Sequence, residues 1–117
     1  MALILHITTR SHWQTAQQEG IYTADSLATE GFIHCSTPAQ VVSTANAFFR
    51  GQTELVLLCI ESDRVQSEIR YEAVHGDRFP HLYGALNLDA VTQAINFQPN
   101  ADGNFTLPLV LQSEEAV

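Results

Sequence analysis

The run from Glu54 to Ile60, ELVLLCI, constrains the fold of this chain more than any other segment. Its apolar residues are nearly continuous rather than alternating, and the run has the length of a strand. A strand that is apolar on both faces has to be covered on both sides. The chain has 117 residues, the usual size of one domain, so we expect the covering elements to come from the same domain.

Two further strands are expected in the N-terminal half. Residues 3–9, LILHITT, form an apolar strand that a histidine interrupts, and residues 32–35, FIHC, follow a glycine and form a second, shorter strand. Residues 21–30 show no clear periodicity and are expected to be a loop.

Two helices lie between these strands and the central one. Ser11 matches the cap of a capping box, which starts a helix that runs to about residue 19 and ends at Gly20. Thr37 caps a second helix, with Pro38 at its first position, where the missing N–H costs nothing. Apolar residues then recur at one-face helical spacing, and Gly51 ends the helix.

The C-terminal half predicts short strands and turns. Residues 68–73 alternate between polar and apolar and form a strand, residues 75–78 form a loop, residues 81–83 form a short strand, and residues 89–94 form a helical turn.

A hairpin is expected at the end of the chain, with strands at 94–98 and 104–109 around Asp102 and Gly103. Residues 112–117 are expected to be a frayed polar tail. The mixed order of short elements favours a single α+β domain over residues 1–111, with a largely antiparallel split sheet and two main short helices.

Composition excludes several kinds of protein. The net charge is −8, from 13 acidic and 5 basic residues, so general nucleic-acid or membrane-surface binding is disfavoured. No apolar run approaches the ~18 residues of a membrane span, and the start of the chain lacks the pattern of a signal peptide, so we expect a cytoplasmic protein. Cys35 and Cys59 are too few and too far apart for a disulfide scaffold or a cysteine metal site.

The first candidate cluster lies at the end of the first strand. His6 either hydrogen-bonds inside the core or points into a cavity. Thr8 and Thr9, followed by Arg10, favour a ligand-binding edge at this end of the strand.

The second candidate cluster lies at the junction between strand and helix. His34 and Ser36 are not needed for the fold, and the N-terminus of the following helix suits an anion or a ribose hydroxyl. A nucleophilic pair of Cys35 and His34 is disfavoured, because adjacent strand residues point to opposite faces.

Two more clusters lie in the second half. Arg70 and Glu72 share one strand face, either as a solvated ion pair or as part of a site. In the segment FPHLYG, His81, Tyr83 and Gly84 favour close approach to a planar group, whereas a well-packed turn explains its aromatics and proline but not its histidine.

These clusters lead to two predictions. His6, His34, Ser36 and His81 are expected to line one cavity, because each interrupts an apolar or capping pattern without serving it. No metal is expected, since the histidines show no local ligand spacing.

The motifs LILHITTR, GFIHCST and FPHLYGALNLDAV, in this order, resemble a bacterial family known as domain of unknown function 952 over residues 3–110. That family has no established activity. It is similar in fold to the ADP-ribosyltransferases, which bind NAD in a cleft between two small antiparallel sheets.

The resemblance implies roles for individual residues. His6 would fix the ribose, His34 and Ser36 would lie at the nicotinamide end, and Tyr22 or Tyr83 would stack on the ligand. For the acidic position of the third strand, Glu72 is the nearest carboxylate, whereas the strand at FPHLYG would put His81 or Tyr83 there.

The resulting hypothesis is an ADP-ribosyltransferase-like pocket that binds NAD or ADP-ribose and transfers ADP-ribose or hydrolyses NAD. Glu72 and His81 are the catalytic candidates, and the binding candidates share placement in or beside the four clusters: His6, Thr8, Tyr22, His34, Ser36, Arg70 and Tyr83. A non-catalytic module for a nucleotide or another small molecule is the alternative, and a peptide-binding protein is a third reading. The sequence does not indicate an oligomeric state.

Overall fold

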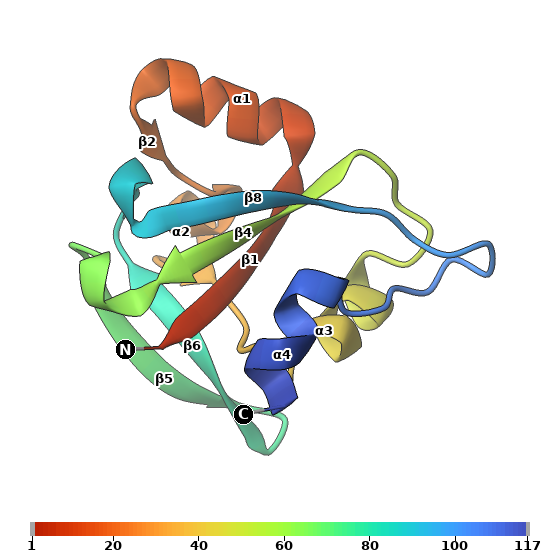
Figure 1. The fold of residues 1–117 in the computed structure, drawn as a ribbon. Coiled ribbons are helices and arrows are strands. Elements are labelled where there is room, and N and C mark those ends of the chain that lie inside the picture. Colours follow the sequence, from red (N-terminus) through yellow and green to blue (C-terminus); the bar gives the residue numbers. More distant parts are fainter. Residues whose placement is uncertain (1, 117) are drawn as a thin grey trace.

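Strand β4 (Leu55–Glu61) is the centre of a three-stranded antiparallel sheet, between β1 (Leu3–Thr9) and β8 (Val91–Phe97) (Figure 1). We describe a computed structural model that covers the backbone of residues 2–116 and the side chains of residues 2–112. The first six residues of β4 are all buried. The prediction that this strand is covered on both faces is therefore confirmed.

Two separate apolar clusters cover the two faces of this sheet. Ile4, Val56 and Leu58 belong to one cluster, which includes residues of a second sheet. Leu57 and Val41 belong to the other cluster, which includes a helix and the C-terminal segment. Alternate residues of β1 and β4 therefore contribute to opposite cores, because neighbouring side chains in a strand point to opposite faces.

The second sheet has the order β3-β6-β5, with β3 at Ile33–His34, β6 at Asp77–Tyr83 and β5 at Glu68–Val74. A turn of two residues, His75 and Gly76, joins β5 to β6, and both have positive φ (50° and 83°). Such a turn matches the twist of the strands that it connects. The loop predicted at 75–78 is therefore shorter, because β6 already begins at Asp77.

The two three-stranded sheets are linked through β1. Backbone hydrogen bonds join Leu5 and Ser36 in both directions, at 2.7 and 2.8 Å. The short strands β2 (Ile21–Tyr22) and β7 (Leu86–Asn87) form a third antiparallel pair. All ladders among the described residues are antiparallel, which confirms a small α+β fold with antiparallel sheets.

Helix α1 (Arg10–Glu19) lies along the three-stranded sheet of β1, β4 and β8 (Figure 1). Its cap is Thr9, whose hydroxyl accepts the N–H of His12 at 3.1 Å. The predicted cap Ser11 is therefore wrong by two residues, because Thr9 at the end of β1 already has the extended backbone that a cap needs. Gly20 ends the helix with φ 83°, as predicted.

Helix α3 (Val41–Phe48) begins later than the sequence predicts. Thr37 opens a turn instead of capping the helix, and its N–H donates to Oε1 of Gln40 at 3.0 Å. The helix ends at Phe49 rather than at Gly51, which has φ 77°. Gln40 therefore supplies one half of a capping box without the other half from Thr37.

Two other segments differ from prediction. Residues 21–30 contain β2 and helix α2 (Asp25–Thr29) instead of a continuous loop. The helical turn expected at 89–94 is a short 3-10 turn at Leu88–Ala90 followed directly by β8. Another 3-10 turn, at Ser62–Arg64, joins β4 to β5.

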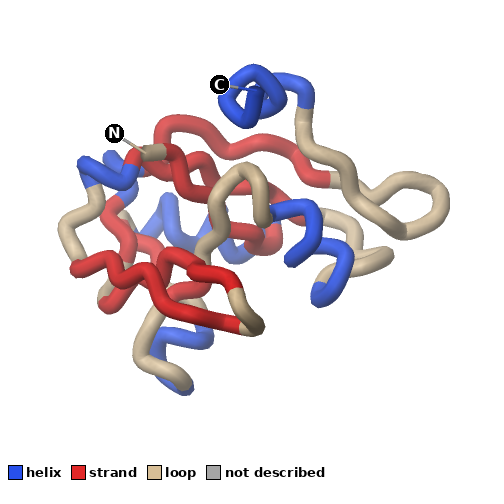
Figure 2. Tube along the Cα trace, turned by 90° about the horizontal axis from the view of Figure 1, so that it is seen from below, coloured by secondary structure: helices blue, strands red, loops and turns tan. Residues whose placement is uncertain are grey.

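The predicted C-terminal hairpin is wrong. The chain does turn near Asp102, but β8 pairs with β4 rather than with residues 104–109, because β8 completes the central sheet. The chain then forms helix α4 (Leu109–Ala116), with Phe105 and Leu111 in the second core. Residues 112–116, which were predicted as part of a frayed polar tail, have helical backbone in α4. Whether this end of the helix frays stays a prediction. In Figure 2 the C-terminal helix lies at one edge of the molecule. None of the described helices is long and apolar enough to cross a membrane.

Candidate functional site

A cleft of about 580 Å³ lies between helix α3, the segment around Ser36 and the β5–β6 turn. Its lining includes His6, His34, Ser36 and His81. These residues come from β1, β3, the following loop and β6. The prediction that these four residues line one cavity is confirmed, whereas their roles stay predictions.

We call the part of the cleft lined by these four residues the polar end. The rest of the lining is mixed: Ala47, Phe48, Val74 and Phe79 are apolar, whereas Gln40, Ser43, Thr44, His75 and Asp77 are polar. Phe48 is 72% exposed, so it lies at the surface instead of in a core. A volume of this size is typical of small-molecule sites.

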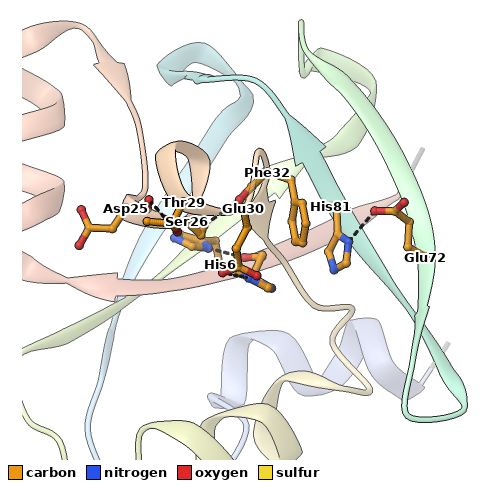
Figure 3. Close-up of polar contacts among 9 residues, drawn as sticks. His6, Asp25, Ser26, Thr29, Glu30, Phe32, Glu72 and His81 are labelled. Carbon is orange, nitrogen blue, oxygen red and sulfur yellow. Dashed lines mark hydrogen bonds and ion pairs between the residues drawn. The ribbon is translucent and has the colours of Figure 1, made fainter.

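His81 and Glu72 form a hydrogen-bonded pair beside the polar end (Figure 3). The β5–β6 register places Arg70 opposite His81 and Glu72 opposite Phe79, so these side chains share one face of the sheet. The Nδ1–H of His81 donates to Oε1 of Glu72 at 2.8 Å, and the Tyr83 hydroxyl donates to the same oxygen at 2.5 Å. Glu72 itself does not line the cleft.

The two donors determine the protonation of this group. The hydrogen bond from Tyr83, and then the one from His81, lowers the pKa of Glu72, while the same carboxylate raises the pKa of Tyr83. Glu72 is therefore an ionised acceptor at neutral pH. Because Nδ1 of His81 carries a proton, Nε2 is the basic nitrogen of the neutral ring, and it makes no hydrogen bond to the residues that the structure describes.

Phe32 belongs to this group, although the sequence interpretation did not assign it to the site. Its ring stacks on the His81 imidazole, with centroids 4.1 Å apart and planes at 18° (Figure 3). The centre of its ring also lies 4.8 Å from that of His34 and 5.3 Å from that of Tyr83. The alternation of β3 was a usable signal, because Phe32 and His34 are two residues apart and share a face.

Glu30 is a second residue that the sequence interpretation missed. Its Oε2 lies 3.1 Å from Nε2 of His34, and both side chains are about half exposed. It sits just after α2, in the segment predicted as a loop without periodicity. A lone glutamate in such a segment gives no signal by spacing.

His6 is buried, with both ring nitrogens engaged. Its Nδ1–H donates to the carbonyl of His34 at 2.5 Å, and Nε2 lies 2.7 Å from the Tyr22 hydroxyl, which is itself 3.0 Å from the Thr8 hydroxyl. Burial lowers the pKa of His6 to about 4 and raises the pKa of Tyr22 to about 12. His6 is neutral near pH 7, so its Nε2 accepts a hydrogen bond from the Tyr22 hydroxyl.

This network changes the expected contacts of three residues. Thr8 and Tyr22 lie behind His6 and do not line the cleft, and Tyr22 is 1% exposed. His6 reaches the cleft wall, but its nitrogens already bind protein atoms. In this structure His6 holds β3 in place through the His34 carbonyl.

Two readings were open for Arg70, a solvated ion pair with Glu72 or a part of a site, and the ion pair is not observed. Its Nη2 instead donates to Oε1 of Glu68 at 3.0 Å, and its guanidinium lies 4.2 Å from the centre of the Tyr83 ring. Arg70 lies outside the cleft lining.

The remaining polar candidates have mainly structural contacts. The Ser36 hydroxyl donates to Thr44 at 3.4 Å. Burial raises the pKa of the Cys35 thiol, which keeps it protonated and unreactive. A Cβ on Gly84 would lie 2.8 Å from that of Ser67, so the close approach expected at Gly84 is to protein rather than to a ligand.

No group of three or more His, Cys, Asp or Glu side chains among the described residues is arranged to hold a metal ion. A separate feature of the site is an acid–base pair, His81 with Glu72. The orientation of an imidazole by a carboxylate is the arrangement that makes histidine an effective proton acceptor.

Comparison with known proteins supports the fold and supplies no reaction. No curated protein matches the chain. A crystal structure of protein CC0527 from Caulobacter crescentus is 35% identical, with a TM-score of 0.85 over 99% of this chain and 100% of that one. The solution NMR structure of CC0527 is 36% identical, with a TM-score of 0.79 over 97% of each chain. The model of one family matches residues 7–94, and on these grounds the chain belongs to the family described as protein of unknown function (DUF952).

Proposed function

We propose that the cleft binds an N-ribosyl compound of the NAD type and that the chain cleaves its N-glycosidic bond, with transfer of the ribosyl group to water or to another acceptor. The observation that carries this proposal is the Glu72–His81 pair, whose imidazole lines the cleft. The expected likeness to the ADP-ribosyltransferase fold is part of the same proposal.

The reaction needs little covalent chemistry from the protein. The bond between C1 of the ribose and the nicotinamide nitrogen breaks. Its electron pair moves to the ring nitrogen and neutralises the pyridinium charge, so the leaving group is neutral nicotinamide. Water then adds its oxygen to C1 and loses a proton. A positioned base and a nearby negative charge are the groups that lower such a barrier.

His81 would accept the proton of the attacking water on Nε2. Glu72 would hold the ring in the tautomer with Nδ1–H and stabilise the imidazolium that forms, since the two groups are 2.8 Å apart. His34 and Ser36 would contact the ribose from the same end of the cleft. These roles place His81, rather than Glu72, nearest to the reacting atoms.

A second candidate function is a non-catalytic binding module. It is favoured by the position of Glu72, which lies outside the cleft lining and already accepts hydrogen bonds from His81 and Tyr83. In that case the same cleft binds the ligand without breaking it.

Nicotinamide release, measured by chromatography, separates the two candidates. The parent protein is incubated with NAD and with nicotinamide riboside, which share the scissile bond, and ligand affinity is measured by calorimetry. Glu72→Gln should lower turnover on the order of a hundredfold or more with affinity nearly unchanged. Glu19→Gln, a charge-matched change at the end of α1, should leave both unchanged.

Three outcomes bear on the proposal. Release by the parent with a large loss in Glu72→Gln supports it. Binding without release leaves the non-catalytic module. Absence of binding by both compounds rejects the cleft as a site for this ligand class.

A further inference from the structure

The cleft contains no arginine or lysine. The chain has five arginines and no lysine, and all five arginines fall within the described residues. None of them lines the cleft, whose lining includes the carboxylate of Asp77 and the imidazoles of four histidines. Phosphate groups in protein sites are usually bound by arginine, lysine or free backbone N–H groups.

Most of the arginines are engaged elsewhere. Arg10 pairs with Glu54 at 3.3 Å, Arg70 with Glu68 at 3.0 Å, and Arg78 donates to the Tyr71 carbonyl at 3.2 Å. Arg50 donates to the carbonyl of Asp102 at 3.0 Å. These four arginines therefore bind groups of the protein outside the cleft.

Part of the backbone at the start of α3 is already engaged. The N–H groups of Gln40 and Val41 both donate to the carbonyl of Thr37, at 3.0 and 3.1 Å. The N–H of Thr37 donates to the Gln40 side chain. These three amides are therefore not available to a phosphate.

We infer that the natural ligand of the cleft carries no phosphate and is an uncharged or cationic nucleoside-like N-glycoside rather than a dinucleotide. This inference rests on the proposed function and specifies its substrate class. The ribose occupies the polar end at His34 and Ser36, and the base lies against Phe48 and Val74, which are 72% and 38% exposed. The net charge of −8 acts in the same direction, because it repels polyanionic ligands.

A series of three compounds tests the charge of the ligand directly. Nicotinamide riboside, nicotinamide mononucleotide and NAD share the same ribosyl–nicotinamide bond and differ in their phosphates. Affinities are measured by calorimetry at pH 8, above the ordinary imidazole pKa of about 6.5. We expect the riboside to bind at least about tenfold more tightly than either phosphorylated compound, and we expect added salt to narrow this ratio.

A charge introduced into the cleft provides the complementary test. Ser43 on α3 lines the cleft and is exposed, so Ser43→Arg places a guanidinium there without disturbing a core. This substitution should raise the affinity for NAD about fivefold. The affinity for the riboside should stay nearly unchanged or fall. Gln17→Arg on α1 is the matched control, since it changes the net charge equally and lies outside the cleft.

The possible results distinguish this inference from the proposed function. Tighter binding of NAD than of the riboside by the parent protein would overturn the inference and leave the function in place. An equal gain for Ser43→Arg and Gln17→Arg would show that net charge, not the cleft, sets the preference, and would also overturn it. If none of the three compounds binds, both proposals fail.

Discussion

Acid should destabilise this fold mainly through His6. Its ring is 8% exposed and both of its nitrogens are hydrogen bonded, Nδ1 to the His34 carbonyl and Nε2 to the Tyr22 hydroxyl. Protonation of Nε2 requires a charge in a buried site, and burial lowers the pKa of His6 from 6.5 to about 4. His6 therefore binds a proton less readily in the folded protein than in the unfolded chain.

The sign and size follow from these two pKa values. Between pH 6.5 and pH 4 the unfolded chain binds more protons than the folded one, so the free energy of unfolding falls as the pH is lowered. Each pKa unit corresponds to about 1.36 kcal/mol. Lowering the pH from 7 to 4 should therefore cost about 3 kcal/mol through His6 alone, a large share of the roughly 5–15 kcal/mol typical of a domain.

Urea denaturation of the parent and of His6→Gln at several pH values measures this contribution. The variant cannot titrate at this position, so its stability advantage or deficit relative to the parent should change by about 3 kcal/mol between pH 7 and pH 4. The carboxylates are common to both proteins and cancel in the comparison.

A second readout protects the test if His6→Gln folds poorly. The ring protons of His6 in the parent, followed by NMR, should show no titration above about pH 5, given a folded pKa of about 4. Parallel pH profiles for parent and variant, together with a His6 ring that titrates near 6.5, would refute the reasoning.

Three further changes test particular contacts. Gly84→Ala should lower the free energy of unfolding by about 1–3 kcal/mol, because the new Cβ meets Ser67 at 2.8 Å; an unchanged urea midpoint would contradict this. Phe32→Leu should lower the free energy of unfolding by about 0.5–1.5 kcal/mol in urea denaturation, because it removes the ring that stacks on His81 with centroids 4.1 Å apart, and an unchanged urea midpoint would argue against a contribution from this stack. His75→Asn should raise stability by about 0.5 kcal/mol in urea denaturation, because φ is 50° there, and a loss of stability would argue against backbone strain.

The site was partly readable from the sequence. Residues that interrupt a pattern, such as His6, His34 and His81, were found because a histidine in an apolar strand needs a reason. Phe32 and Glu30 were missed, because an aromatic residue in a strand and a glutamate in a loop are ordinary where they stand. Their roles depend on neighbours that lie far away in the sequence, as Phe32 depends on His81.

Elements with local sequence signals could be predicted without the structure. The apolar run 54–60 required a strand with two covered faces, and the alternation at 68–73 predicted a strand with one polar face; both are observed. Gly20 ends the first helix as predicted, because a positive φ of 83° suits glycine. Periodicity and backbone sterics act within a few residues, so no knowledge of the rest of the chain was needed.

The tertiary structure alone decided which strands pair and which polar groups meet. The turn near Asp102 predicted a hairpin, but β8 pairs with β4, since the central sheet gains more from that edge than a separate hairpin would. From the sequence, the carboxylate of Glu72 could equally have paired with Arg70, two residues away. The β5–β6 register instead places it beside His81, nine residues away, with which it forms a hydrogen bond. Pairing register and burial are long-range quantities, and they determine the protonation of His6 and the orientation of His81, on which the proposed chemistry depends.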